Sequence, residues 1–396
     1  MTARLTRLLG DFDLAEDLVQ EAIISALEHW PREGVPDVPA AWLLTVAKRK
    51  GLDRLRRATR YRDKLALLEE EAGRATVDPT EVRSGAMAMT YTDDRLELIF
   101  TCCHPALSRE AQVALTLRSV AGLTTPEIAR AYLIPEATLA QRIVRAKRKI
   151  VEAGITFKAP EAHDLAERLG EVLAVLYLVF NEGYLSSGPE RAARRDLAED
   201  AEWLASLVVR LLPQEPEALG LLALMRLHAS RAFTRFDERG RIVLLKDQDR
   251  SRWDRSKVAS AIELLERAGA MRRPGPYQLQ AAIAAVHAEA AVWDETDWPQ
   301  ILRLYDALLA ASAGSPVVRL NRAIALRHVA GPELALREVD EIAEDLDRYH
   351  LLHATRAVLL RDLGRTDEAR EADRRALDLT DNPAERALLE ARIATL

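Results

Sequence analysis

Apolar side chains recur every three to four residues along most of this chain, the period of an α-helix with one buried face. The first such stripe runs from Leu14 to Ala26 and predicts a helix that reaches Trp30 and ends at Pro31. A second helix is expected from about Ala40. Ala, Leu, Arg and Glu are abundant and aromatic residues make up only 5%, which favours helices over strands. We therefore predict an all-α protein.

The stretch from 121 to 150 has the order of elements of a helix-turn-helix. A threonine at 124 or 125 can cap a short helix that carries Pro126 and Glu127 in its first turn. A tight turn through residues 134–135 follows, and a longer helix starts at about Glu136. The apolar residues expected to face inward are Ile128, Ala129, Leu139, Ile143 and Ile150. Upstream, Ser108 is expected to cap another helix, which would run from Arg109 to Val120.

The longer helix of this motif carries a basic face, with five bases and no acid between 141 and 149. Side chains of this kind contact phosphates and base edges when a helix lies in the major groove of DNA. We therefore predict a recognition helix that exposes a polar and basic set to DNA: Thr138, Gln141, Arg142, Arg145, Lys147, Arg148 and Lys149.

A second basic run lies at residues 42–64, which contain nine Lys or Arg residues and only two acidic residues. Most charge runs are solvated helix faces. This run has almost no interleaved acids to form pairs along a helix, so a polyanion partner explains it better. The chain as a whole carries a formal charge of −6, which hides that asymmetry. Residues 1–158 hold 24 basic and 22 acidic residues, and residues 159–396 hold 32 and 40.

Several function classes receive no support from the sequence. No apolar run approaches the ~18 residues of a membrane helix, and the N-terminus lacks a signal peptide's apolar stretch. The two cysteines, Cys102 and Cys103, are adjacent, which suits thiols in a reducing cytoplasm better than a disulfide or a metal site with His104. No phosphate loop, metalloprotease motif or nucleophile elbow occurs. We expect a cytoplasmic protein that is not an enzyme and holds no metal or cofactor.

The first 158 residues resemble a bacterial sigma factor of the extracytoplasmic-function (ECF) type, within the sigma-70 family. Residues 13–21, Asp-Leu-Ala-Glu-Asp-Leu-Val-Gln-Glu, followed by Trp30, resemble the core-binding helix of region 2. Residues 40–48 and 53–57 resemble the helix used for promoter melting, and 93–150 resemble region 4. The expected domains are region 2 at 1–72, a linker at 73–92 and region 4 at 93–158.

The resemblance implies core RNA polymerase and promoter DNA as partners. It implies docking on the β′ clamp and β flap, with region 2 contacting the clamp through Asp13, Glu16, Asp17, Gln20 and Glu21. It places the −10 element near Trp42, Lys48, Arg49, Arg56, Arg57 and Arg60, where an aromatic platform among bases suits single-stranded DNA. The recognition helix defined above would read the −35 element.

Residues 159–396 form an added module that resembles the helical extension of one group of ECF sigma factors. Ala323 and Ala357 are 34 residues apart, the period of a tetratricopeptide repeat, and residues 351–383 fit that pattern best. Segments 181–184, 244–254 and 275–280 look like fixed landmarks. The dense charges of 244–254 beside Trp253 indicate either a ligand or partner pocket or, with more weight, an internal salt-bridge network.

Two functional hypotheses follow. The first is a sigma factor that directs promoter-specific transcription initiation and is regulated by its extension, which we expect to contact the sigma regions. The alternative is a helix-turn-helix regulator or adaptor whose repeats bind proteins and which acts without core polymerase. The 13–21 helix discriminates between them, since a plain DNA-binding regulator has no need of it.

Overall fold

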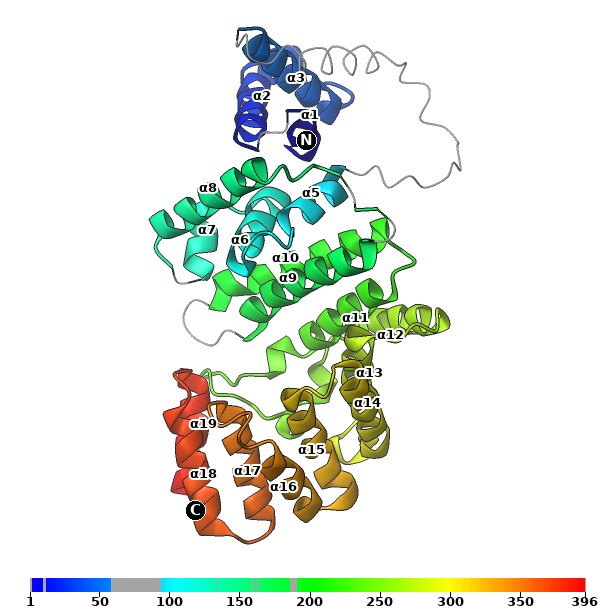
Figure 1. Ribbon diagram of the computed structural model, residues 1–396, viewed down its shortest axis with the longest axis vertical. Helices are drawn as coiled ribbons and strands as arrows, with labels where there is room; N and C mark the ends of the chain where they lie inside the picture. The colour runs from blue at the N-terminus through cyan, green and yellow to red at the C-terminus, as the bar shows by residue number, and fades with distance from the viewer. Residues whose placement is uncertain are drawn as a thin grey trace. The chain divides into compact units, whose positions relative to one another are not determined.

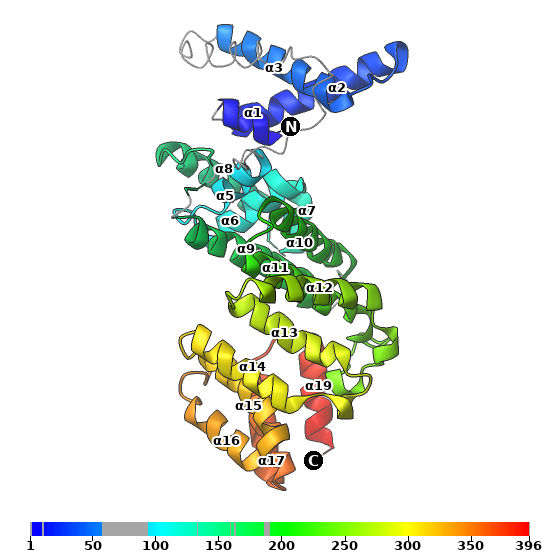
Figure 2. The ribbon, with the colours of Figure 1, turned by 90° about the vertical axis from the view of Figure 1, so that its right-hand side faces the viewer.

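The computed structural model describes residues 2–9, 12–57, 94–132, 134–158, 160–161, 164–185 and 191–395. The chain divides into two compact units, Met1–Val175 and Leu176–Leu396. The predicted linker at 73–92 lies outside the described residues. Within the described ranges the regular structure is helical and contains no β-strand, only an isolated bridge between Phe236 and Ile242. The all-α prediction is confirmed (Figures 1 and 2).

The first unit begins with three helices: α1 (Thr2–Leu9), α2 (Phe12–Glu33) and α3 (Pro39–Arg57). The predicted stripe of α2 faces inward, with Leu18 and Ala22 fully buried. Ala47 of α3 and Leu5 and Leu9 of α1 complete this small core. Burial of these side chains holds the three helices together.

Helix α2 does not end at Pro31, as the sequence predicted, but continues to Glu33. Gly34 follows the helix with a φ of +87°, and its N–H donates to the Trp30 carbonyl at 3.0 Å. A glycine in this left-handed conformation is a common helix terminator. The prediction was wrong because Pro31 lies in the last turn, where the glycine supplies the terminating hydrogen bond.

The rest of the first unit's core comes from five further segments. They are α5 (Asp94–Cys102), α6 (Arg109–Leu115), the π-helical segment η3 (Thr116–Ala121), α7 (Thr125–Ala131) and α8 (Glu136–Glu152). Ser108 caps α6 as predicted, accepting a hydrogen bond from the Ala111 N–H. The helix expected to continue to Val120 changes to π-helical geometry at Thr116. Gly122, with a φ of +85°, then ends it.

The start of α9 (Leu165–Leu185) is attached to this core. The Arg168 guanidinium donates to the Phe100 carbonyl at 2.7 Å. Arg109 of α6 forms an ion pair with Glu171 at 2.9 Å. The first two turns of α9 therefore stabilise the fold that contains the helix-turn-helix.

The second unit is a succession of helices, each packed on its neighbours (Figures 1 and 2). The helices are α10 (Arg191–Leu211), α11 (Pro216–Ser230), α12 (Arg255–Ala270), α13 (Pro276–Glu289), α14 (Trp298–Ala311), α15 (Pro316–Ala330), α16 (Pro332–Glu341), α17 (His350–Asp362), α18 (Thr366–Asp378) and α19 (Pro383–Ala394). Short 3-10 turns connect some of them: η4 (Ala232–Thr234), η5 (Leu245–Asp247), η6 (Arg250–Arg252) and η7 (Trp293–Glu295).

Small residues lie where the C-terminal helices pack together. Ala323 of α15, Ala335 of α16, Ala357 of α17 and Ala369 of α18 are all fully buried in one core cluster. Side chains of this size let neighbouring helices approach closely. Gly364, with a φ of +73°, forms the turn between α17 and α18. Assignment of these helices to the tetratricopeptide class stays a prediction.

Close packing of α11 against α13 explains one of the sequence landmarks. Glu217 on α11 accepts hydrogen bonds from the backbone N–H groups of Tyr277 and Gln278, at 3.0 and 3.2 Å. A Cβ at Gly275 would lie 2.3 Å from the Glu217 carboxyl carbon, so a larger residue there would displace the carboxylate that accepts these hydrogen bonds. Segment 275–280 is therefore a capping and crossing site between two helices.

None of the described helices is long and apolar enough to cross a membrane.

Candidate nucleic-acid and polymerase interfaces

The first helix of the helix-turn-helix is capped as its sequence predicts. The Glu127 carboxylate accepts hydrogen bonds from the Thr124 N–H and hydroxyl, both at 2.7 Å. The Thr124 hydroxyl accepts one from the Glu127 N–H at 3.4 Å. This reciprocal arrangement is a capping box, and it fixes where α7 begins.

Helix α8 starts at Glu136 as predicted and presents two different faces. Its apolar face is buried together with that of α7, and the buried residues are Ile128, Ala129, Leu139, Ile143 and Ile150. On the other face, Thr138, Gln141, Arg145, Arg148 and Lys149 are exposed, and Arg142 is partly exposed. The Arg145 Nε donates to the Gln141 carbonyl at 3.3 Å, and Arg148 pairs with Glu152 at 3.0 Å. The structure thus brings six of the seven predicted recognition residues onto accessible surface.

Lys147 differs from the prediction that it is exposed, because the residue is buried. Its Nζ lies 2.8 Å from an oxygen of Asp13 and 3.2 Å from one of Glu16, both on α2. Lys147 follows the buried Ala146 on the inner edge of α8, where two carboxylates attract it. Arg118 of η3, which sequence reasoning missed, lies 3.8 Å from the same Glu16 oxygen.

The acidic residues predicted to bind core polymerase therefore have different surroundings. Asp13 and Glu16 contact Lys147. Glu21 lies 3.4 Å from Lys50 of α3, which also donates to the Glu21 backbone carbonyl at 3.3 Å. Asp17 and Gln20 are exposed. Two of the five predicted residues thus share a contact with the helix predicted to read DNA.

The residues predicted to bind the −10 element lie on α3 and beyond it. The Trp42 ring is half-buried, and its centroid lies 5.5 Å from that of Trp30 on α2 at an interplanar angle of 59°. Lys48 is half-buried and Arg49 is exposed on the same helix. Arg56 and Arg57 belong to the last turn of α3, but their side chains, like the whole of Arg60, lie outside the described residues. The aromatic pair and Arg49 form the described part of this surface.

The adjacent cysteines are part of the interior. Both are fully buried, and the Cys103 Sγ lies 3.4 Å from the Thr116 hydroxyl. Burial raises the pKa of the Cys103 thiol to about 12 and that of Cys102 well above its usual value. Both thiols therefore stay protonated and unreactive. No cluster of potential metal ligands occurs among the residues that the structure describes.

Charged side chains of the landmark at 244–254 form hydrogen bonds with backbone groups. Arg250 is 5% exposed and donates to the carbonyls of His287 and Ala290, both at 2.8 Å. Arg255, which directly follows the segment, donates to the Ala288 carbonyl at 3.1 Å. Asp254 accepts from two backbone N–H groups at the start of α12. Arg250, Asp254 and Arg255 therefore cap helix ends, and among the described residues these contacts replace the expected salt-bridge network.

Together these features define a helix-turn-helix whose second helix has a basic, exposed face, an arrangement typical of proteins that bind DNA. Three family models match the chain. Sigma-70 region 2 matches residues 2–61, sigma-70 region 4 matches 97–150, and a family of unknown function, DUF6596, matches 168–269.

Comparison with individual proteins agrees with these matches. The ECF RNA polymerase sigma factor SigL of Mycobacterium tuberculosis (strain ATCC 25618 / H37Rv) is 31% identical over 155 residues, 38% of this chain and 82% of SigL. The probable ECF sigma factor SigI of the same strain is 29% identical over 167 residues, 41% of this chain and 54% of SigI. Uncharacterized protein R00370 of Rhizobium meliloti (strain 1021) is 46% identical over 98% of this chain and 91% of its own length.

The chain belongs to the sigma-70 family and is similar to its ECF members. A sigma factor role follows from the presence of both regions in order on one chain. The similarity to R00370 extends through the helical extension, whereas the region 2 and region 4 matches end at residue 150.

Proposed function

We propose that this protein binds core RNA polymerase through α2 and directs promoter-specific transcription initiation, reading the −35 element with α8. The observation that carries the proposal is a capped helix-turn-helix with an exposed basic face on the same chain as a region 2 helical core. The alternative, a DNA-binding regulator that acts without polymerase, has no use for the α2 surface.

Run-off transcription with purified core polymerase tests the proposal directly. We expect a promoter-dependent product when the full chain is added to core enzyme and a template with its cognate promoter. Polymerase binding without any promoter-dependent product would contradict the initiation role. DNA binding without polymerase capture would favour the regulator.

Core binding is best tested at exposed positions of α2 other than the two carboxylates that contact Lys147. Reversal of Asp13 or Glu16 would also break the ion pairs with that lysine, so a loss of binding would have two causes. Asp17→Lys and Gln20→Lys change exposed positions on the same helix. Capture of core polymerase should fall at least tenfold, because like charge opposes docking on a complementary surface. Glu28→Lys, exposed three turns further along α2, is the matched control and should bind normally.

We also propose that the C-terminal helices, a tetratricopeptide-like module, regulate this activity by contacting the sigma regions. The beginning of α9 belongs to the region 4 fold, so a truncation that tests regulation should retain residues up to Leu185. Removal of residues 191–396 should change the promoter-dependent activity or its control. Unchanged transcription, with unchanged binding to −35 DNA as the check on folding, would contradict a regulatory role.

A further inference from the structure

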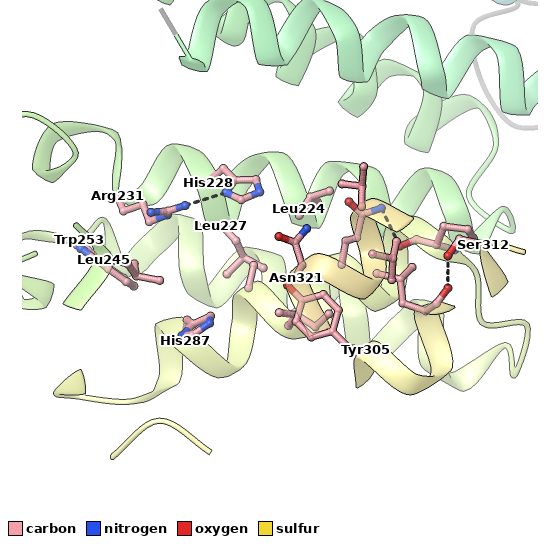
Figure 3. A pocket seen from close by; sticks show the side chains of 17 residues that line it. Leu224, Leu227, His228, Arg231, Leu245, Trp253, His287, Tyr305, Ser312 and Asn321 are labelled. Carbon is pink, nitrogen blue, oxygen red and sulfur yellow. Dashed lines mark hydrogen bonds between the residues drawn. The ribbon is translucent and has the colours of Figure 1, made fainter. Parts of the chain in front are cut away.

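A cavity of about 380 Å³ lies inside the C-terminal unit, lined by residues of α11, α13, α14 and α15 and of the segment that precedes α12 (Figure 3). Leu224 and Leu227 of α11 and Ile283 of α13 contribute apolar wall. Small-molecule sites typically have volumes of about 300–1,000 Å³ and apolar walls with a few polar groups. The size and lining therefore suit a small organic ligand.

Arg231 supplies the charge of this cavity. It directly follows α11, and its Nη2 lies 3.5 Å from the Nδ1 of His228 (Figure 3). Among the described residues no carboxylate lies within ion-pair distance of Arg231, and neither Asp nor Glu lines the cavity. A partly buried guanidinium without a counterion is costly, so the cavity favours an anion over a cation.

The two histidines in the cavity wall remain uncharged. Burial, followed by the nearby Arg231 and Arg235, lowers the pKa of His228 to about 3. Burial, followed by Arg250, Arg231 and His328, lowers that of His287 to about 4. Since neither ring is positively charged near neutral pH, Arg231 is the single cation that the described residues contribute to the lining, and it defines one place for a negative head group.

Neutral hydrogen-bond donors line the same space. Trp253 is 4% exposed, and within the described part of the chain its indole N–H has no acceptor. Burial raises the pKa of Tyr305 to about 12, so its hydroxyl keeps its proton. Figure 3 shows Arg231 and Trp253 toward one end of the cavity and Tyr305 and Asn321 further along it. A buried donor without an acceptor costs free energy that a ligand oxygen recovers.

We propose that this cavity binds a small organic anion, with a carboxylate or phosphate head held by Arg231 and neutral donors such as the Trp253 indole N–H, and with an apolar body against the leucine and isoleucine walls. The site belongs to the C-terminal helices and does not depend on the sigma factor role. Its test therefore measures binding and not transcription.

The test uses 1-naphthaleneacetate as the carboxylate probe, 1-naphthyl phosphate as the phosphate probe and the neutral 1-naphthaleneacetamide. Calorimetric titration into the full chain should show at least one anion binding about tenfold or more tighter than the amide, because charge-assisted hydrogen bonds are the stronger ones. The tighter anion identifies the head group. Equal affinity for anions and amide, or no binding of any probe at millimolar concentration, would overturn the proposal.

Three variants locate the site. Arg231→Gln should weaken anion binding about tenfold while leaving amide affinity unchanged. Arg337→Gln removes an exposed arginine from α16 and should change neither. Ala284→Phe fills the cavity and should abolish binding of all probes, with circular dichroism confirming the fold. Anion binding that survives both Arg231→Gln and Ala284→Phe would place the ligand elsewhere and refute this site.

Discussion

Two groups of arginines in this chain differ in their exposure and in their hydrogen-bond partners. On α8, Arg145 and Arg148 lie on an exposed helix face, and their contacts with described residues are local ones within that helix. Arg250, which precedes α12, is buried, and Arg255 is the first residue of α12. Both donate hydrogen bonds to carbonyls at the C-terminal end of α13. Charge density alone therefore does not identify a binding surface. What decides is whether unsatisfied carbonyls of the fold lie within reach of the guanidinium.

The largest effect should come from removing the buried arginine. Arg250→Ala leaves the His287 carbonyl of α13 and the Ala290 carbonyl just after that helix without their donor, and we expect a loss of about 3 kcal/mol in local stability. Hydrogen exchange of the backbone amides in α12 and α13 measures this loss. Arg252→Ala, an exposed neighbour two residues along the chain, is the control and should change stability by less than about 0.5 kcal/mol. Equal effects at both positions would show that the backbone contacts of Arg250 do not stabilise the fold.

The exposed arginines should instead affect DNA binding. Arg145→Ala should weaken binding to −35 DNA by about 1–3 kcal/mol if the side chain reads a base, and nearly uniformly across sequences if it contacts phosphate. Footprinting on matched and altered promoters separates these outcomes. Thermal stability should remain within about 0.5 kcal/mol, because no buried group loses a partner. A stability loss like that of Arg250→Ala would show that α8 also uses its charges internally.

The two cavity histidines, which lie near these and other arginines, should be visible in the pH dependence of stability. Burial, with Arg250 and Arg231 nearby, holds the pKa of His287 at about 4, and burial with Arg231 and Arg235 holds that of His228 at about 3. Unfolded histidines titrate near 6.5, so below that pH the unfolded chain binds more protons and the folded state loses stability as pH falls.

Between pH 7 and pH 5 we expect each of these histidines to lower the stability of the C-terminal unit by about 1–2 kcal/mol. Denaturant unfolding followed at several pH values measures the slope. His228→Gln should reduce that slope by about half, whatever its effect at pH 7. A slope unchanged by His228→Gln would show that this ring is already protonated or accessible in the folded protein.

The smallest effect is expected from substitution of Lys147. This residue lies on the helix predicted to read DNA, but it is buried, as Arg250 is. Lys147→Gln should cost about 1 kcal/mol through loss of the Asp13 and Glu16 contacts. It should reduce −35 DNA affinity less than Arg145→Ala, since its amine faces α2. DNA-binding titrations of both variants under the same salt conditions make the comparison. An equal loss of DNA affinity in the two variants would indicate that Lys147 also contacts DNA, as the sequence predicted.

Local signals predicted the parts of the fold that depend on nearby residues. The spacing of apolar residues located the buried faces of α2 and α8, because helical periodicity needs no distant partner. Thr124 and Glu127 marked the start of α7, since a capping box closes within four residues. The exposed recognition residues followed from the same periodicity. The prediction that α2 ends at Pro31 was wrong because the hydrogen bond that ends this helix is donated by the Gly34 N–H.

Charge placement depended on residues far apart in the chain. Nothing in the sequence around Lys147 indicates that Asp13, 134 positions away, will bind it. The role of Arg250 likewise depends on carbonyls 37 and 40 residues further along. The cavity around Arg231 exists only because α11, α13, α14 and α15 meet there.

The order of elements, the helical class and the sigma-70 regions could thus be read from the chain itself, since periodicity, caps and motifs are encoded in short segments. Which charges face outward and which cap the interior was decided by the tertiary structure. The physical reason is that desolvation and hydrogen bonding act between groups that only folding brings together.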